Sequence, residues 1–281
     1  MTVGYRLPAE QIAATSRAFL TGPPRPGHRP GRPGRFVAVI VGDGHPLADV
    51  GRAVETAVFE PAFGNDAAVM SAEYGPYENR SLFFVVLDRR TGLPAGAARV
   101  IAGVGAEVKT IADAPAHIGR SVDEIVDAHG MRDQTVWDFA TVAVLPQYRG
   151  TRYGLTVSSL LYRAFAVAAT HAGVEHAVVM LDVRAWRNMT LIGNRLYPLA
   201  GSAPFAYLGS ADTRALYARI PDFVADMTRQ AAALRGFGTG YAGRIPGRGW
   251  RRLVARRVAA NVAHRLATGD TLDQNIVHAV Y

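Results

Sequence analysis

The sequence predicts a mixed α/β (α+β) fold, because short buried strands alternate with amphipathic helices through the centre of the chain. FVAVIV at 36–41 is an apolar run typical of a buried strand, and PLADVGRAVETAVFEPAF at 46–63 has apolar residues at helical spacing. SLFFVVLD at 81–88 and PAGAARVIAGV at 94–104 lie on either side of a turn at 90–92 that contains glycine. This arrangement predicts a β-hairpin.

Similar patterns continue to residue 222. A helix is expected over 121–130, because Ser121 precedes an acidic first turn and Gly130 can end the helix. Strands are expected at 135–144 and 176–182, with a long helix between them at 155–173. We interpret 186–199 as a further helix, and 205–209 with 213–220 as a final pair of strands.

Composition divides the chain into three segments. Residues 1–35 are an N-terminal segment that ends in GPPRPGHRPGRPG at 22–34, whose prolines and glycines predict an extended linker. Residues 36–222 form the expected domain. Residues 223–281 are interpreted as a helical, basic C-terminal extension, in which WRRLVARRVAANVAHRLA at 250–267 has an apolar face.

Composition also excludes several classes of protein. With 49% hydrophobic and 19% charged residues, the 281-residue chain has the balance of a folded globular protein, and the absence of cysteine excludes thiol catalysis and disulfide scaffolds. No apolar run reaches the roughly 20 residues of a membrane helix. The start, MTVGYRLPAE, lacks the features of a secretion signal. We therefore expect a cytoplasmic protein without a transmembrane segment.

The formal net charge of +8 is concentrated at the two ends of the chain. Residues 1–35 hold six arginines and one glutamate, and residues 223–281 hold nine arginines and three aspartates. Basic ends suit an anionic partner, such as nucleic acid, an anionic membrane or an acidic carrier protein. A mutational bias toward arginine codons explains the same composition equally well.

The segment that follows the strand at 135–144 holds the strongest functional signal. Leu-Pro and then QYRGTRYG at 147–154 lead from this strand into the next helix. Such a loop directs unpaired backbone N–H groups and the positive end of a helix dipole toward one point, which can bind an anion. Gly150 and Gly154 would let the backbone approach a phosphate, and Arg149 and Arg152 would add charged donors. A tight surface turn is the alternative interpretation.

VAVLPQYRGTRYG resembles the donor-binding motif of the GNAT superfamily of N-acyltransferases, Val-x-Pro-x-x-Arg-Gly-x-Gly-x-Gly, with Arg152 in place of the middle glycine. Leu196, Tyr197 and Gly201 resemble the Leu-Tyr-x-x-x-Gly segment of that family, with Asn188 similar to its upstream asparagine. The resemblance covers about 36–222. It implies a GNAT-like, mostly antiparallel mixed sheet flanked by helices, which binds an acyl thioester. The donor contacts that we expect are Val142, Val144, Arg149, Gly150, Thr151, Arg152, Tyr153 and Gly154.

Within this superfamily, the N-terminal half resembles the acyl-homoserine-lactone synthases and the long-chain N-acyl amino acid synthases. EYGPYE at 73–78 and GAAR at 96–99 resemble their Glu-x-Asp-x-Tyr-Asp block and their Gly-x-x-Arg. Trp137-Asp138 is similar to the Trp-Glu of their fourth strand. Gly75 and Thr141, however, stand where the lactone synthases have an acid and an arginine that help to hold a sulfonium amino acid. We therefore expect a different amine acceptor.

Acyl transfer from a thioester to an amine needs a neutral nucleophile. An amine with a pKa near 10.4 is neutral in about one molecule in a thousand at pH 7, equivalent to about 4 kcal/mol, so a general base is useful. The resemblance points to Asp138 as that base and to Tyr197 as the acid that protonates the departing thiolate. Glu60, Glu73 and Glu78 are substitute bases, each equally readable as a surface carboxylate. The histidines show no paired ligand spacing, so no metal is expected.

These observations predict an N-acyltransferase that moves a medium or long acyl chain from acyl-coenzyme A or an acyl carrier protein to a small-molecule or peptide amine. A small-amine acetyltransferase that uses acetyl-coenzyme A is the first alternative. A non-catalytic binding module of the same fold, with basic tails, is the second. No RNA-binding motif accompanies the arginines, so nucleic acid is disfavoured as a partner. An acyl carrier protein is the candidate protein partner.

Overall fold

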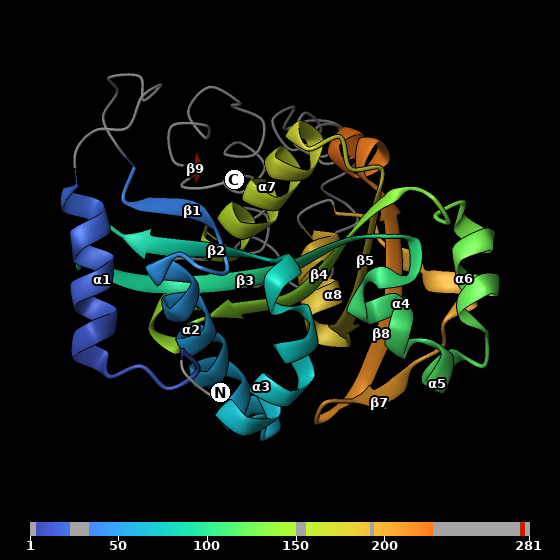
Figure 1. Cartoon of the computed structure of the whole chain (residues 1–281), viewed down its shortest axis with the longest axis horizontal. Coiled ribbons are helices and arrows are strands. Elements are labelled where there is room, and N and C mark those ends of the chain that lie inside the picture. The colour runs from blue at the N-terminus through green and yellow to red at the C-terminus, as the bar shows by residue number, and fades with distance from the viewer. Residues whose placement is uncertain (1–3, 23–33, 150–155, 192–193, 227–275, 279–281) are drawn as a thin grey trace, which may run out of the picture.

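The computed structural model describes residues 4–22, 34–149, 156–191, 194–226 and 276–278, which form a mixed sheet with helices on both faces (Figure 1). The helices are α1 (Ala9–Thr21), α2 (Pro46–Phe63), α3 (Ala67–Tyr74), α4 (Lys109–Asp113), α5 (Pro115–Ile118), α6 (Val122–His129), α7 (Thr156–His171) and α8 (Val183–Leu191). Short 3-10 helices are η1 (Gly75–Arg80), η2 (Gly105–Glu107), η3 (Pro146–Tyr148) and η4 (Leu199–Gly201). The strands are β1 (Phe36–Gly42), β2 (Ser81–Asp88), β3 (Leu93–Val104), β4 (Thr135–Val144), β5 (His176–Asp182), β6 (Tyr197–Pro198), β7 (Phe205–Tyr207), β8 (Ser210–Arg219) and β9 (Ile276–His278).

The strands lie in the order β6-β8-β5-β4-β3-β2-β1-β9, and β7 also pairs with β8. Neighbouring strands are antiparallel except for two pairs, β4 with β5 and β1 with β9. The predicted class, a mostly antiparallel mixed sheet flanked by helices, is confirmed. Helix α7 covers one face of the sheet, while α2, α3 and α4 lie on the other (Figure 1).

Local signals in the sequence explain the ends of the helices. His45 caps α2 by accepting a hydrogen bond from the Leu47 N–H, and Gly64 ends that helix at a φ of +76°. In α6, Ser121 and Glu124 form a reciprocal capping box, and Gly130 follows at a φ of +65°. The predicted helices at 46–63 and 121–130 are therefore confirmed.

One sequence-based element is wrong and another was missed. The helix expected over 186–199 begins earlier, at Val183, and ends at Leu191, whereas Tyr197 and Pro198 form β6. A proline ring at 198 cannot continue a helix without losing a backbone hydrogen bond, which explains the error. Helix α1 was not predicted, although it packs Ile12 and Phe19 against the sheet.

Only part of the C-terminal extension can be compared with its prediction. The helix expected at 250–267 lies outside the described residues. Residues 220–226 are helical, but Ile276–His278 form a strand beside β1 rather than part of a helical extension. Ile276 is buried in the main core, so this end of the chain completes the edge of the sheet.

The strand β4 carries an extra residue opposite β3. Arg99 is opposite Thr141 and Ile101 is opposite Asp138, so two residues of β4 face the single residue between them on β3. This β-bulge turns the consecutive residues Ala140 and Thr141 toward the same face of the sheet. It lies next to the point where β4 separates from β5.

A buried ionic network holds this part of the sheet. The Arg99 and Glu55 side chains are both fully buried and form an ion pair at 2.7 Å. Arg99 also forms an ion pair with Glu78 at 2.9 Å and donates a hydrogen bond to the Tyr5 hydroxyl at 2.8 Å. The Thr141 hydroxyl donates to Glu55, so the network reaches the bulge in β4.

We expect the substitution Arg99→Met to lower the free energy of unfolding by about 3–5 kcal/mol, because the Glu55 charge would stay buried without its partner. The measurement is urea unfolding followed by circular dichroism. Arg132→Met is the matched control: Arg132 forms exposed ion pairs with Asp123 and Asp127, so its loss should cost less than about 1 kcal/mol. Equal effects of the two substitutions would contradict this account.

Candidate active site

A cavity of about 480 Å³ lies where β4 and β5 separate. The two strands pair only through Val136–Asp138 and His176–Val178, whereas β4 continues to Val144 and β5 to Asp182. The unpaired ends of both strands line the cavity, together with residues of α2, α3, α7 and the turn between β7 and β8. A volume of this size is typical of a small-molecule site.

The cavity connects the two faces of the sheet. Phe139, Val157 and Tyr162 line it and belong to the core under α7. Met70 and Tyr74 line it as well, but they belong to the core on the opposite face. The walls of the cavity therefore include residues from both faces of the sheet.

The backbone of β4 directs polar groups into the gap. The Leu145 N–H donates to the Ala95 carbonyl of β3, and in an antiparallel ladder the residues bonded to one neighbour alternate with residues that face away from it. The N–H and C=O groups of Val142 and Val144 therefore point away from β3, toward the gap left by β5. Both residues line the cavity.

Arg149 lies at the same end of the cavity. Its Nε atom donates to the Val144 carbonyl oxygen at 2.6 Å, which holds the guanidinium beside the end of β4. The other residues of the expected donor loop, Gly150, Thr151, Arg152, Tyr153 and Gly154, lie outside the described residues. Of the expected donor contacts, the structure thus brings Val142, Val144 and Arg149 together at one cavity.

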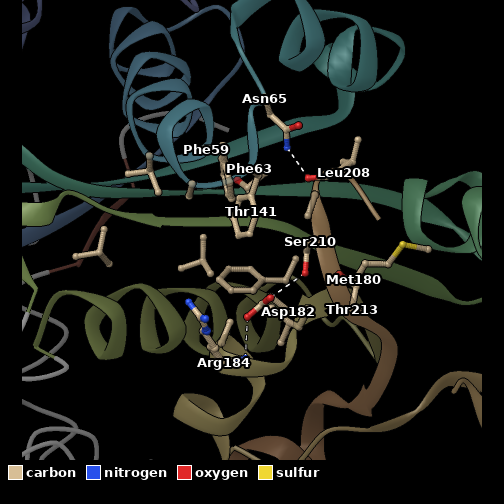
Figure 2. A pocket seen from close by; sticks show the side chains of 18 of the residues that line it. Phe59, Phe63, Asn65, Thr141, Met180, Asp182, Arg184, Leu208, Ser210 and Thr213 are labelled. Atoms are coloured by element: carbon tan, nitrogen blue, oxygen red, sulfur yellow. Dashed lines mark hydrogen bonds between the residues drawn. The ribbon is translucent and has the colours of Figure 1, made fainter. Parts of the chain in front are cut away.

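Polar side chains mark the β5 and β8 side of the cavity (Figure 2). Asp182 lines the cavity, where one carboxylate oxygen accepts from the Ser210 hydroxyl at 2.8 Å and the other from the Arg184 N–H at 2.8 Å. Asn65 donates to the Leu208 carbonyl at 2.9 Å and so ties the β7–β8 turn to the segment after α2. Sequence reasoning did not identify these residues, because they are far apart in the chain.

Asp138 is completely buried and does not line the cavity. Its two carboxylate oxygens accept hydrogen bonds from the backbone N–H of Thr110, at 2.6 Å, and from the Thr110 hydroxyl, at 3.0 Å. Burial raises the pKa of Asp138 to about 7, although the bonds from Thr110 act in the opposite direction. The side chain therefore connects β4 to α4, close to the bulge.

The substitute bases lie in three different settings. Glu60 is exposed near the end of α2, and Glu78 belongs to the network around Arg99. Glu73 is half-buried and forms an ion pair with Lys109 at 2.8 Å. None of the three lines the cavity.

A second charged cluster lies near Asp138 and includes a residue that lines the cavity. Lys109 is buried and pairs with Asp113 at 2.6 Å as well as with Glu73. The Tyr207 hydroxyl donates to Asp113 at 2.6 Å, and Tyr207 lines the cavity. Of this cluster, only Glu73 was a candidate from the sequence. The bond between Tyr207 and Asp113 was missed because it joins segments 94 positions apart, which leaves no local pattern in a sequence.

Tyr197 lies away from the cavity. Its side chain is 53% exposed, and β6 pairs with β8 rather than with β5 or β4. The η4 turn that follows is tied to α6, because the Ala200 N–H donates to His129 Nε2 at 2.9 Å. The side chain of Asn188 lies outside the described residues.

We expect acidic pH to destabilise the edge of the sheet formed by β6 and β8. Burial lowers the pKa values of both His129 and His176, which contact Tyr217. An unfolded chain, whose histidines titrate near 6.5, then binds more protons than the folded one, so the free energy of unfolding falls as the pH drops below about 6.5. Urea unfolding at pH 7.5, 6.5 and 5.5 measures this. The His129→Gln, His176→Gln double variant should show a smaller fall, and an equal fall in both proteins would contradict the assignment.

Other types of site have no support in the described part of the chain. There, no group of three or more histidine, aspartate or glutamate side chains is placed to hold a metal ion. None of the described helices combines the length and the apolar character that crossing a membrane requires.

Comparison with known proteins gives a fold but no family assignment by sequence. No protein-family model matches the chain, and no curated protein matches it. Among solved structures, the chain is similar to FeeM, an N-acyl amino acid synthase from uncultured soil microbes, with a TM-score of 0.52 and 13% identity over 68% of this chain and 94% of that chain. The fold is therefore similar to that of FeeM, and the expected architecture, a mostly antiparallel mixed sheet flanked by helices, is confirmed.

Two further matches have lower structural similarity. The acyl-homoserine-lactone synthase LasI matches with a TM-score of 0.38 and 12% identity, over 50% of this chain and 64% of that chain. BjaI, a coenzyme A-dependent acyl-homoserine-lactone synthase whose structure contains isopentyl-coenzyme A, matches with a TM-score of 0.40 and 13% identity, over 66% of this chain and 83% of that chain.

Proposed function

We propose that this protein is an N-acyltransferase that moves an acyl group from a phosphopantetheine thioester to an amine. The observation that carries the proposal is the cavity between β4 and β5, which joins the two faces of the sheet. A thioester that enters from one side and an amine that enters from the other would meet between the strands. Holding both reactants in one site supplies much of the acceleration for such a reaction.

The donor would lie on the α7 side of the cavity. The N–H groups of Val142 and Val144 and the Val142 carbonyl point into the gap, where the N–H groups could donate to a thioester oxygen and all three could bond an extended pantetheine arm. Arg149, at the end of β4, would contact the phosphates. The loop 150–154 is proposed to complete the phosphate site with its backbone N–H groups.

The acyl group would occupy the apolar part of the cavity. Phe59, Phe63, Met70 and Met180 line this space and leave room for far more than an acetyl group. Their apolar side chains favour a medium or long hydrocarbon chain, because each buried methylene adds about 0.8 kcal/mol. FeeM, which shares the fold, is an N-acyl amino acid synthase, and this supports transfer to nitrogen.

The amine must lose a proton during the reaction. A pKa of about 7 suits Asp138 for proton transfer near neutral pH, and it stays the sequence-based candidate for the general base. Its carboxylate is fully buried and held by Thr110, so a proton could reach it only through other groups. The role of Tyr197 as the acid that protonates the thiolate stays a prediction. Its side chain is exposed at the edge of the sheet and does not line the cavity.

The proposal is tested by turnover with acyl-coenzyme A donors of two to twelve carbons and a panel of primary amines, with amide and free thiol measured separately. We expect kcat/KM to rise about fourfold per added methylene up to about eight carbons, as each methylene enters the cavity. Preference for acetyl-coenzyme A would instead identify a small-amine acetyltransferase. Binding of a donor without any thioester cleavage would favour a non-catalytic module. To decide between the two donors, turnover is compared for the same acyl chain on coenzyme A and on an acyl carrier protein at equal concentration.

We also expect Arg149→Ala to raise the dissociation constant of octanoyl-coenzyme A about 10- to 100-fold, because a charge-assisted hydrogen bond contributes about 1.5–3 kcal/mol. Isothermal titration calorimetry at two salt concentrations measures the effect, which salt should weaken. Arg120→Ala is the control, since Arg120 forms an exposed pair with Glu124 on α6, away from the cavity. Equal affinities of the two variants for octanoyl-coenzyme A would contradict a role of Arg149 in binding the donor.

A further inference from the structure

Tyr207 joins the cavity to a carboxylate. Tyr207, in β7, lines the cavity, and its hydroxyl donates to Asp113 Oδ2 at 2.6 Å. Because the hydroxyl proton is committed to Asp113, the oxygen keeps its lone pairs for a donor that approaches from the cavity. An N–H group of an amine in the cavity is such a donor.

Asp113 belongs to a charged cluster that is partly open to solvent. Lys109 Nζ lies 2.6 Å from Asp113 and 2.8 Å from Glu73, so this trio carries one uncompensated negative charge. The Asp113 side chain is 28% exposed, which gives a proton a route to solvent. Asp138, in contrast, is fully enclosed.

The position of Tyr207 is fixed by the turn that follows it. Asn65 donates to the Leu208 carbonyl at 2.9 Å (Figure 2). Gly209 has a φ of +79°, and a Cβ atom there would lie 2.1 Å from the Phe63 carbonyl oxygen, so only glycine fits. These contacts hold Tyr207 against the cavity on the face of the sheet opposite α7.

The charged and titratable groups around Tyr207 come from four other elements, α3, α4, α5 and β4. Lys109 lies over the Tyr207 ring at 5.7 Å, and the His117 ring lies edge-on at 5.4 Å. Tyr74 and Asp138 act on Tyr207 electrostatically. Burial and the bond to Asp113 raise the pKa of Tyr207 well above its usual value, so the phenol stays protonated and can pass a proton on without forming a tyrosinate.

We infer that Tyr207 and Asp113 form a proton relay that accepts the proton of the attacking amine, an inference that rests on the proposed N-acyl transfer. The amine lone pair forms the C–N bond while the C=O π electrons move to oxygen. The N–H proton passes to Tyr207 Oη as the Tyr207 proton passes to Asp113. The carbonyl then re-forms, the C–S bond breaks with its electron pair on sulfur, and the thiolate takes a proton from water, to which Asp113 returns its own.

The relay is tested with Tyr207→Phe and Asp113→Asn under saturating octanoyl-coenzyme A and the best primary amine of the panel. For both variants we expect kcat to fall about 10²- to 10⁴-fold, the range of general-base catalysis. The remaining kcat should rise more steeply with pH than that of the unaltered protein, because hydroxide must then remove the proton. The dissociation constant of octanoyl-coenzyme A should change less than threefold in Tyr207→Phe.

Tyr77→Phe is the matched control, because Tyr77 lies near the same charged cluster but does not line the cavity, and its kcat should stay within threefold. Asp138→Asn and Asp182→Asn test the two rival carboxylates. A kcat of Tyr207→Phe within threefold of the unaltered protein would overturn the relay, and a large loss in one rival would identify the base. If the unaltered protein itself forms no amide, the proposed function fails, and the relay with it.

Discussion

The separation of β4 from β5 is the constraint on which the site depends. Backbone N–H and C=O groups inside a protein are almost always hydrogen-bonded. A buried group that has no partner lowers the free energy of unfolding by about 1–3 kcal/mol. Pairing stops after Asp138 and Val178, although both strands continue, so the polar edge of β4 faces a cavity instead of a neighbouring strand. The extra residue in β4 sits at this junction. A bulge there bends the strand and gives the gap a fixed place.

Bonds between buried polar and charged groups connect the elements that surround the gap. On one side, Arg99 and Glu55 are bound to each other and to Thr141, which lines the cavity. On the other, Asp138 holds Thr110 at the start of α4. Both sets of bonds are enclosed in apolar core, where they are hard to replace by water. Side chains held in this way keep a reactive geometry more precise than loops would.

Much of the fold could be predicted because its signals are local. The hairpin at 81–104 has a turn between two apolar runs, and α2 and α6 have recognisable ends. The error at 186–199 arose where apolar spacing was given more weight than Pro198. In the site, Val142, Val144 and Arg149 followed from one continuous motif. Tyr207 and Asp113 did not, because 94 positions separate them in the chain and only the folded sheet brings them together.

The N-terminal residues have a consequence for any attempt to shorten the protein. Tyr5 joins the network of Arg99 and Glu78, and Phe19 of α1 covers a valine-rich face formed by β1 and β2. A fragment that starts at residue 36 would uncover this face and would remove the hydrogen bonds of Tyr5 to Arg99 and Glu78. Exposed apolar strand surface promotes self-association. We therefore expect such a fragment to aggregate instead of folding as an independent domain.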